Sequence, residues 1–151
     1  MAPQNLPPRA KGGANNVSLR SKSREFAMQM LFQWDMSRQA PEKLEPVFWK
    51  SAKAAAETRG FANQLFEGAS HDAANLDELI AKHAANWRLD RLAAIDRAIL
   101  RLALHEMRAT DTPVKVVINE AVELAKKYSS DDAKGFVNGI LDAYHKSLEH
   151  K

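Results

Sequence analysis

Residues 90–107 read DRLAAIDRAILRLALHEM. Apolar residues recur in this stretch every three or four positions, a spacing that places side chains on one face of an α-helix. Asp90 precedes them as a potential N-cap, because a short acidic side chain accepts hydrogen bonds from the first helical turn. We therefore expect a central core helix that buries one stripe of side chains: Leu92, Ile95, Ile99, Ala103 and Met107.

The chain on either side of this stretch keeps the helical spacing, and no segment alternates apolar and polar residues for long enough to predict a strand. The sequence therefore predicts an all-α fold of about six or seven helices. We expect helices over 21–38, from Pro41, after Gly60, over 76–87, over 90–107, after Pro113 and over 132–147.

Residues 1–17 are rich in proline, glycine and asparagine. A segment of this composition cannot bury enough apolar area to offset the entropy lost on ordering. The remaining residues fit one domain, since the chain has 151 residues of which 45% are hydrophobic. We expect a disordered N-terminal tail over 1–17 and a single domain over 18–151.

The excess of positive charge lies at the start of the chain. Residues 1–24 contain five basic and no acidic residues, so the net charge of +3 hides a slightly acidic remainder. A basic arm of this kind suits contact with a polyanion, because each cation that meets a phosphate releases condensed counterions. A solubilising tail is the alternative interpretation.

Signatures of enzymes are missing from the sequence. There is no cysteine, which excludes disulfides, thiolate zinc sites and cysteine nucleophiles. No phosphate-binding glycine loop, nucleophile elbow or zinc-binding histidine pair is present, and the five histidines are scattered. No apolar run is long enough for a signal peptide or a membrane helix. We expect a cytoplasmic protein without catalytic activity, cofactor, metal or membrane contact.

Phe32 does not fit a plain amphipathic helix. On a helical projection it falls almost opposite the face that gathers Phe26, Met30 and Trp34, so it points away from the main core of its helix. An aromatic ring near several cations is typical of an RNA or protein contact, because bases stack on rings while cations hold phosphates. The alternative is that another helix covers Phe32.

Two acidic residues of the core helix, Asp96 and Glu106, project toward its apolar face, whereas Arg97 and Arg101 lie outside that face. A buried carboxylate without a partner is costly, so we expect both acids to be paired structurally. Recognition of RNA or of a partner is the alternative role.

Phe136 lies in the second turn of the last predicted helix, behind the polar segment 129–132 that supplies potential caps. It is at the edge of the apolar stripe of that helix. Phe136 is therefore either a ring at the edge of the core or a platform on which a base can stack.

Three blocks of the sequence together resemble the NusB family: SREFAMQMLFQWD at 23–35, NWRLDRLAAIDRAILRLALHEM at 86–107 and TPVKVVINEAVELAKKYSSDDAKGFVNGILD at 112–142. The resemblance extends over roughly residues 18–145. It implies an all-helical fold of two packed bundles and an RNA-binding adaptor. In that family the partner is NusE, a small-subunit ribosomal protein, and the pair recognises the single-stranded boxA element of ribosomal or phage transcripts.

The resemblance also implies a function in transcription. The complex, with other Nus factors, helps RNA polymerase read through terminators and is required for efficient synthesis of ribosomal RNA. A NusB-like domain also forms the front part of some RNA methyltransferases, but no cofactor loop or catalytic cysteine follows here. A homodimer formed through an exposed Phe32 and Met28 is a further alternative.

The resemblance assigns site residues as follows. An arginine-rich patch matches Arg20, Lys22 and Arg24, although it is leaner here because Ser21 and Ser23 are interleaved. Phe32 matches an aromatic partner contact that is often tyrosine, with Met28 beside it. In the expected RNA-binding site, cations hold phosphates, Phe136 stacks a base, and acids orient the cations or read base edges. The residues of this site are Arg20, Lys22, Arg24, Asp96, Arg97, Arg101, Asp132 and Phe136.

Overall fold

The computed structural model describes the backbone of residues 12–84 and 92–149. Within these ranges the chain forms seven α-helices and no strand, which confirms the predicted all-α fold. The helices are α1 (Gly12–Ser37), α2 (Pro41–Ser51), α3 (Ala56–His71), α4 (Ala73–His83), α5 (Ala94–Ala109), α6 (Val114–Tyr128) and α7 (Ala133–Glu149).

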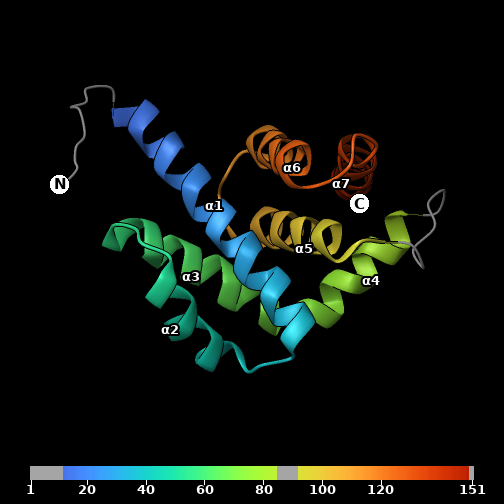
Figure 1. The fold of residues 1–151 in the computed structure, drawn as a ribbon. Coiled ribbons are helices and arrows are strands. Elements are labelled where there is room, and N and C mark those ends of the chain that lie inside the picture. The colour runs from blue at the N-terminus through green and yellow to red at the C-terminus, as the bar shows by residue number, and fades with distance from the viewer. Residues whose placement is uncertain (1–11, 85–91, 150–151) are drawn as a thin grey trace.

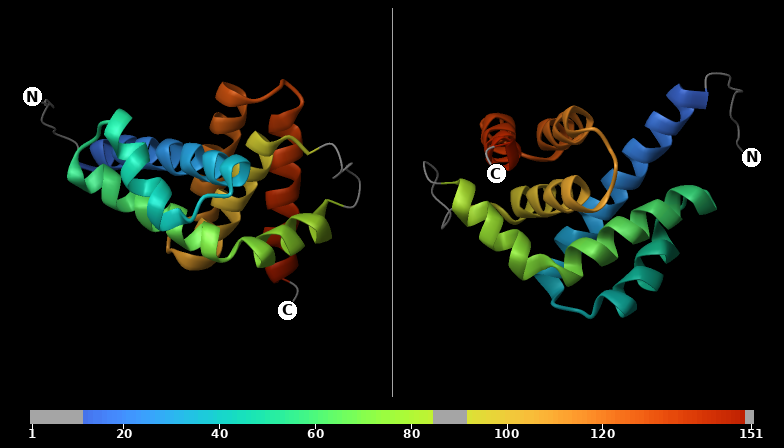
Figure 2. Two further views of the ribbon diagram at one scale, coloured as in Figure 1. Left: turned by 60° about the horizontal axis from the view of Figure 1, so that its bottom comes forward. Right: turned by 180° about the vertical axis from the view of Figure 1, so that it is seen from behind.

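Helix α5 is the centre of the molecule. It packs against α1, α3, α4, α6 and α7, and Figure 1 shows it between α6 and α7 on one side and α3 and α4 on the other. The two views in Figure 2 show α1 lying alongside α3, with α2 packed on the outside of this pair, and α6 beside α7. The helices therefore form two groups that meet across α5, as the resemblance implies. One group contains α1, α2 and α3, and the other contains α6 and α7.

The burial of α5 exceeds the single stripe that its periodicity predicts. Ile99 and Ala103 are buried as expected, but Leu100 and Leu104 are also completely buried. The reason is that α5 has neighbouring helices on several sides, so residues outside its main apolar face also lose contact with water. Leu92, Ile95 and Met107 are half-buried and pack against the same core.

The ends of two helices differ from the prediction. Helix α5 begins at Ala94, and Ala93 takes the N-cap position with extended backbone (φ −66°, ψ 146°). The prediction that Asp90 caps this helix is therefore wrong, and Asp90 itself, like Trp87, lies outside the described residues. Helix α1 begins at Gly12, within the segment for which we expect a tail, and the tail over 1–17 stays a prediction.

The remaining boundaries follow local chemistry. Pro41 opens α2 in the first turn, where its missing N–H is not needed. Pro113 immediately precedes α6. Helix α3 starts before Gly60 rather than after it. Among the residues that the structure describes, no helix combines the length and the apolar character needed to span a bilayer.

Candidate functional site

Two of the three cations predicted near the start of α1 reach solvent. Arg20 is exposed, and its guanidinium lies over the ring of Phe61, 4.1 Å from the ring centroid. The side chain of Lys22 is 56% exposed, and its ammonium lies 3.8 Å from Glu25 on the next turn. Both side chains present positive charge to solvent, Arg20 on the side of α1 that faces α3 and Lys22 on the side that carries Glu25.

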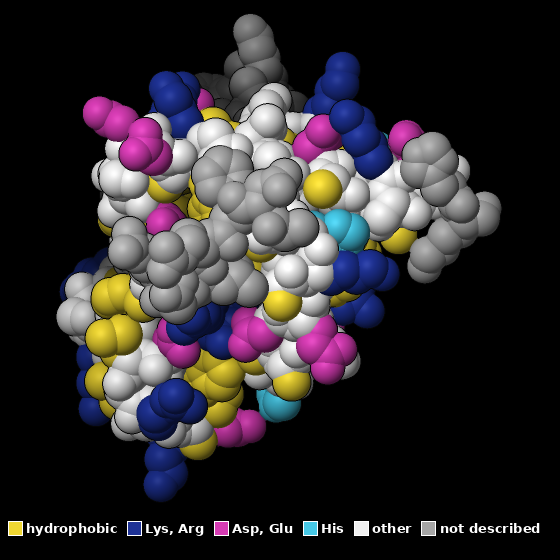
Figure 3. Space-filling view, turned by 90° about the vertical axis from the view of Figure 1, so that its right-hand side faces the viewer, with side chains coloured by type: hydrophobic (Ala, Val, Ile, Leu, Met, Phe, Trp, Pro, Cys, Tyr) yellow, Lys and Arg dark blue, Asp and Glu magenta, His cyan; other side chains and the backbone are white. Residues whose placement is uncertain are grey.

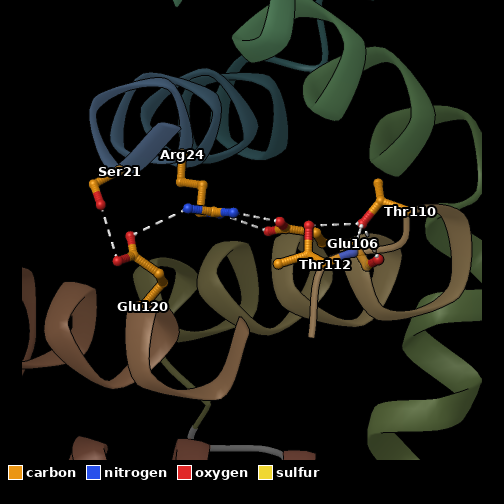
Figure 4. Close-up of polar contacts among 6 residues, drawn as sticks. All are labelled: Ser21, Arg24, Glu106, Thr110, Thr112 and Glu120. Carbon is orange, nitrogen blue, oxygen red and sulfur yellow. Dashed lines mark hydrogen bonds and ion pairs between the residues drawn. The ribbon is translucent and has the colours of Figure 1, made fainter. Parts of the chain in front are cut away.

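Arg24, the third cation, is directed into the protein and is only 3% exposed. Its Nε and Nη2 donate to the two carboxylate oxygens of Glu106 at 2.8 and 2.6 Å (Figure 4). Burial disfavours the charged guanidinium, but hydrogen bonds to Glu106 and the charges of Glu106 and Glu120 outweigh burial and raise the pKa of Arg24. The resemblance assigns Arg24 to a cationic RNA-binding patch, but the structure buries its side chain in an ion pair. The structural pairing expected for Glu106 is confirmed.

The ion pair belongs to a polar network that joins three helices. Arg24 Nη1 lies 3.5 Å from Glu120 of α6, and the hydroxyl of Ser21 donates to the same carboxylate at 2.9 Å. At the other end, the hydroxyl of Thr110 donates to the backbone carbonyl of Glu106 at 2.9 Å. Figure 4 shows these side chains in a row from α1 to the end of α5. The network fixes the turn of α1 that carries Arg20 and Lys22.

The two residues predicted to contact a protein partner differ in burial. Met28 is completely buried, so the prediction that it is exposed to a partner is wrong. Phe32 is half-buried and packs against the core, which agrees with partial covering by another helix. A homodimer contact on this part of α1 would have to be made without Met28.

Helix α1 contacts the end of α6 through polar side chains. Lys127 Nζ donates to Glu25 Oε2 at 2.6 Å, and the Tyr128 hydroxyl donates to the same oxygen. Gln29 Nε2 donates to the Tyr128 oxygen at 2.9 Å. Burial alone would raise the pKa of Glu25, but hydrogen bonds from Lys127 and Tyr128 and two ammonium charges lower it. Glu25, Gln29 and Phe32 share one face of α1, because they are spaced by four and three residues.

The connection between α6 and α7 is tied to the core helix. The Ser129 hydroxyl donates to Asp96 Oδ1 at 2.6 Å, so the nearly buried Asp96 has the structural partner that its position predicts. Asp132 is exposed just before α7, and its carbonyl accepts the Phe136 N–H at 3.4 Å. Phe136 is half-buried, packing against the core while part of its surface remains exposed.

Arg97 and Arg101 line a separate cavity of about 570 Å³ between α1, α4 and α5. Arg101 is buried, and its Nε and Nη2 both donate to Asp77 at 2.8 Å. The prediction that Arg101 lies outside the buried face is therefore wrong. Arg97 is half-exposed and lies 3.5 Å from Asp35. Each arginine already faces a carboxylate, and Trp34 completes the wall beneath Arg101.

The structure thus separates the predicted site into two groups. Lys22 and the α6–α7 connection are linked through Glu25 and Lys127, whereas Arg97 and Arg101 belong to the cavity on another face of α1. Figure 3 views the side of the molecule where α4 and α7 lie, and there Lys and Arg are interspersed with Asp and Glu. The described basic side chains visible on that face do not form one continuous patch.

Sequence reasoning missed Glu25, Gln29, Lys127 and Tyr128. The spacing of Lys22, Glu25 and Gln29 could have shown that they share a face of α1, but their partners on α6 are about a hundred residues away. Within the described ranges, no three His, Asp or Glu side chains gather in an arrangement that could hold a metal ion. The chemistry available at this surface is reversible binding through charge, rings and hydrogen bonds.

Comparison with known proteins points to one family. Residues 21–146 match the NusB family. The transcription antitermination protein NusB of Koribacter versatilis (strain Ellin345) is 46% identical over 132 residues, which is 86% of this chain and 90% of that protein. The protein of the same name from Bacillus subtilis (strain 168) is also 46% identical over 132 residues, covering 86% of this chain and 97% of the relative.

Solved structures show the same fold. A structure of NusB from T. maritima superposes with a TM-score of 0.75 at 32% identity, covering 84% of this chain and 90% of that one. The crystal structure of antitermination factors NusB and NusE in complex with dsRNA gives a TM-score of 0.74 at 30% identity, covering 86% and 98% of the two chains.

Proposed function

The chain belongs to the NusB family of transcription antitermination proteins, and we propose that it binds the boxA element of nascent transcripts together with NusE. In this role it acts by binding and positioning RNA, not by catalysis. A NusB of the same fold is known in complex with NusE and dsRNA, which supports NusE and an RNA as partners. The assembly would act in the cytoplasm with other Nus factors on RNA polymerase, including on ribosomal RNA operons.

The proposed RNA surface runs along the outer side of α1 to the first turns of α7. Arg20 and Lys22 hold phosphates, because both are exposed cations in the same turn of α1, Arg20 beside Phe61 of α3 and Lys22 beside Glu25. Phe136 stacks an unpaired base on its exposed part, and Asp132 accepts hydrogen bonds from base edges. Selectivity for single-stranded RNA follows, since only unpaired bases can be splayed onto a ring.

The observation that carries this proposal is the contact between α1 and the end of α6. Lys22 and Lys127 lie at the same carboxylate, that of Glu25, and the chain continues from Lys127 directly into the segment that holds Asp132 and Phe136. The proposal places the cations for phosphates and the ring for a base along one surface, because the segment that holds Asp132 and Phe136 follows Lys127 directly in the chain. Phe32 provides the proposed contact with NusE through its exposed part, and the nearly buried Asp96 contributes by holding Ser129 of the α6–α7 connection.

Arg97 has a different proposed place. It lines the cavity between α1, α4 and α5 and faces Asp35, so it would act only at the margin of the assembly. Arg24 and Arg101 are left out of the proposed RNA contacts because both are buried in ion pairs with carboxylates.

Phe136 offers the direct test. Phe136→Ala and Phe136→Leu both remove the ring, but leucine keeps most of the apolar packing against the core. If the ring stacks a base, both variants bind a boxA RNA about 1–3 kcal/mol more weakly than the parent protein. Fluorescence anisotropy measures the affinity, and thermal unfolding identifies loss of packing in the alanine variant. Unchanged affinity in the leucine variant would show that Phe136 packs at the edge of the core and does not stack a base.

A further inference from the structure

The carboxylate of Glu25 gathers two lysines from different helices. Lys22 Nζ of α1 lies 3.8 Å from Glu25 Oε1, and Lys127 Nζ of α6 lies 2.6 Å from Glu25 Oε2. The side chain of Glu25 is only 14% exposed, whereas those of Lys22 and Lys127 are 56% and 59% exposed. The acid is therefore held inside, and the two ammonium groups lie outside it.

This arrangement leaves positive charge available to a ligand. Two ammonium groups surround one carboxylate, so the group as a whole carries a charge of about +1 at neutral pH. An ammonium has three N–H donors, and the hydrogen bond from Lys127 to Glu25 uses one of them. The remaining donors of both lysines can meet an anion in the water above Glu25.

A chain of hydrogen bonds fixes the position of Glu25. Gln29 donates to the Tyr128 oxygen, and the Tyr128 hydroxyl donates to Glu25. Gln29 and Glu25 lie one turn apart on α1, while Tyr128 and Lys127 end α6. Both helices therefore contribute to the rigidity of the carboxylate, and through it to the separation of Lys22 and Lys127.

We propose that Lys22 and Lys127 form a phosphate-binding subsite that bridges α1 and α6, with Glu25 as the residue that positions both lysines. This inference rests on the proposed RNA-binding function, and it adds Lys127 and Glu25 to the surface. Lys127 lies two residues before Ser129, which anchors the α6–α7 connection on Asp96. An RNA backbone held at this subsite would continue toward Phe136.

Lys126 provides a matched control. It is the neighbouring residue on the same helix, carries the same charge and has a side chain that is 51% exposed. Its ammonium donates to Glu123, three residues earlier on α6, at 3.2 Å, and consecutive helical residues point about 100° apart. Replacing Lys126 therefore changes the net charge by the same amount without removing the bridge to α1.

The experiment measures the affinity of the full chain for a short boxA RNA and a scrambled RNA over a range of salt concentrations. Lys127→Ala is expected to weaken binding of both RNAs by the same factor, because a phosphate contact does not read sequence. Loss of one phosphate contact makes the negative slope of the logarithm of the binding constant against log salt less steep by about 0.7. It also reduces affinity about fivefold at 0.1 M salt. Lys126→Ala is expected to have a clearly smaller effect on both quantities.

The positioning role of Glu25 is tested by a double-mutant cycle. Glu25→Gln keeps an acceptor for Tyr128 but removes the charge that gathers the lysines. The loss caused by Lys127→Ala is expected to be smaller in the Glu25→Gln background than in the parent protein. Equal losses in both backgrounds would show that Glu25 does not position Lys127 for RNA.

The outcomes separate this inference from the proposed function. If the parent protein prefers boxA but Lys127→Ala binds with the same affinity and salt slope, the subsite is wrong and the proposed function stands. Equal effects of Lys126→Ala and Lys127→Ala would also overturn the subsite, leaving only general charge. If both RNAs bind equally and Lys127→Ala alone lowers the slope, the subsite stands while boxA selectivity fails. Binding of neither RNA at low salt would overturn both.

Discussion

Among the residues that the structure describes, Arg24 and Glu106 form the most buried ion pair. Glu106 is 1% exposed, and removing it leaves the guanidinium of Arg24 without the two hydrogen bonds that hold it. We expect Glu106→Ala to lower the free energy of unfolding by about 3–5 kcal/mol, because the buried cation then has no adequate partner. Urea unfolding followed by circular dichroism measures this loss.

Glu123 on α6 is the control for that experiment. It is exposed and pairs with Lys126 of the same helix, so Glu123→Ala should change the free energy of unfolding by less than about 0.5 kcal/mol. A loss of less than about 1 kcal/mol for Glu106→Ala would contradict the structural role given to Arg24 and would allow it to turn outward toward RNA.

Glu45 on α2 gives the protein a specific pH dependence. Burial, the hydrogen bond with Glu67 and the charges of Glu67 and Glu42 raise the pKa of Glu45 from 4.5 to about 8. Between these values the folded protein binds more protons than the unfolded chain, so stability falls as pH rises through this range. The stabilising contribution is fully present below pH 4.5 and is lost as pH passes about 8.

Replacement by glutamine tests this explanation. Glu45→Gln resembles the protonated carboxyl group, so we expect thermal midpoints close to those of the parent protein at pH 5 and higher than the parent at pH 9. Glu78→Gln, at an exposed position on α4, removes the same charge elsewhere. Thermal unfolding at pH 5, 7 and 9 distinguishes the two variants. An equal shift of the thermal midpoint in Glu45→Gln at all three pH values would contradict the raised pKa of Glu45.

At the scale of the elements, α3 packs closely against α5 at Gly68. A Cβ atom at this position would lie 2.2 Å from His105 Cε1 and 2.3 Å from its Nε2, so the ring would have to move. Burial lowers the pKa of His105, which favours a neutral imidazole in this contact. We expect Gly68→Ala to destabilise the protein by about 1–3 kcal/mol through overpacking, despite the better helix propensity of alanine.

Gly60 in the same helix provides the opposite case. No atom lies within 4 Å of a Cβ placed there, so Gly60→Ala gains helix propensity without a clash and is expected to stabilise by up to about 1 kcal/mol. Thermal and urea unfolding of the two variants should therefore give shifts of opposite sign. A stabilising shift for Gly68→Ala as well would show that the α3–α5 contact is looser than the structure indicates.

At the scale of the whole molecule, periodicity was enough to predict the helices. The spacing of apolar residues in 90–107 predicted the central helix, and Pro41 and Pro113 located the starts of two others. Helix ends were less predictable. Ala93 rather than Asp90 lies at the N-cap of α5, because capping depends on backbone geometry that residue type alone does not determine.

The candidate site could be predicted only in part. Arg20 and Lys22 are exposed as expected, and Asp96 has the expected partner. Arg24, Met28 and Arg101 are buried because α1 and α5 each contact several neighbouring helices, whereas a helical projection shows only one apolar face. Contacts such as Glu25 with Lys127 join residues that are far apart in the sequence, and helical spacing does not report them.

The proposed RNA surface depends on how the two groups of helices meet. Arg20 and Lys22 belong to α1, whereas Asp132 and Phe136 belong to the α6–α7 side, and α5 packs against both groups. The Arg24 network and the Glu25 contacts cross between these groups. The surface therefore exists only in the assembled fold, and neither group would present it alone.

The central claim is tested most directly by fluorescence anisotropy of a short boxA RNA and a scrambled control. Each RNA is titrated with the full chain alone and with NusE, at two salt concentrations. If the chain is the boxA-binding partner of NusE, then NusE tightens binding to boxA and leaves the scrambled RNA unaffected. The claim would be contradicted if both RNAs bound with equal affinity and the higher salt concentration abolished both interactions. Only nonspecific attraction to the cations of α1 would then remain.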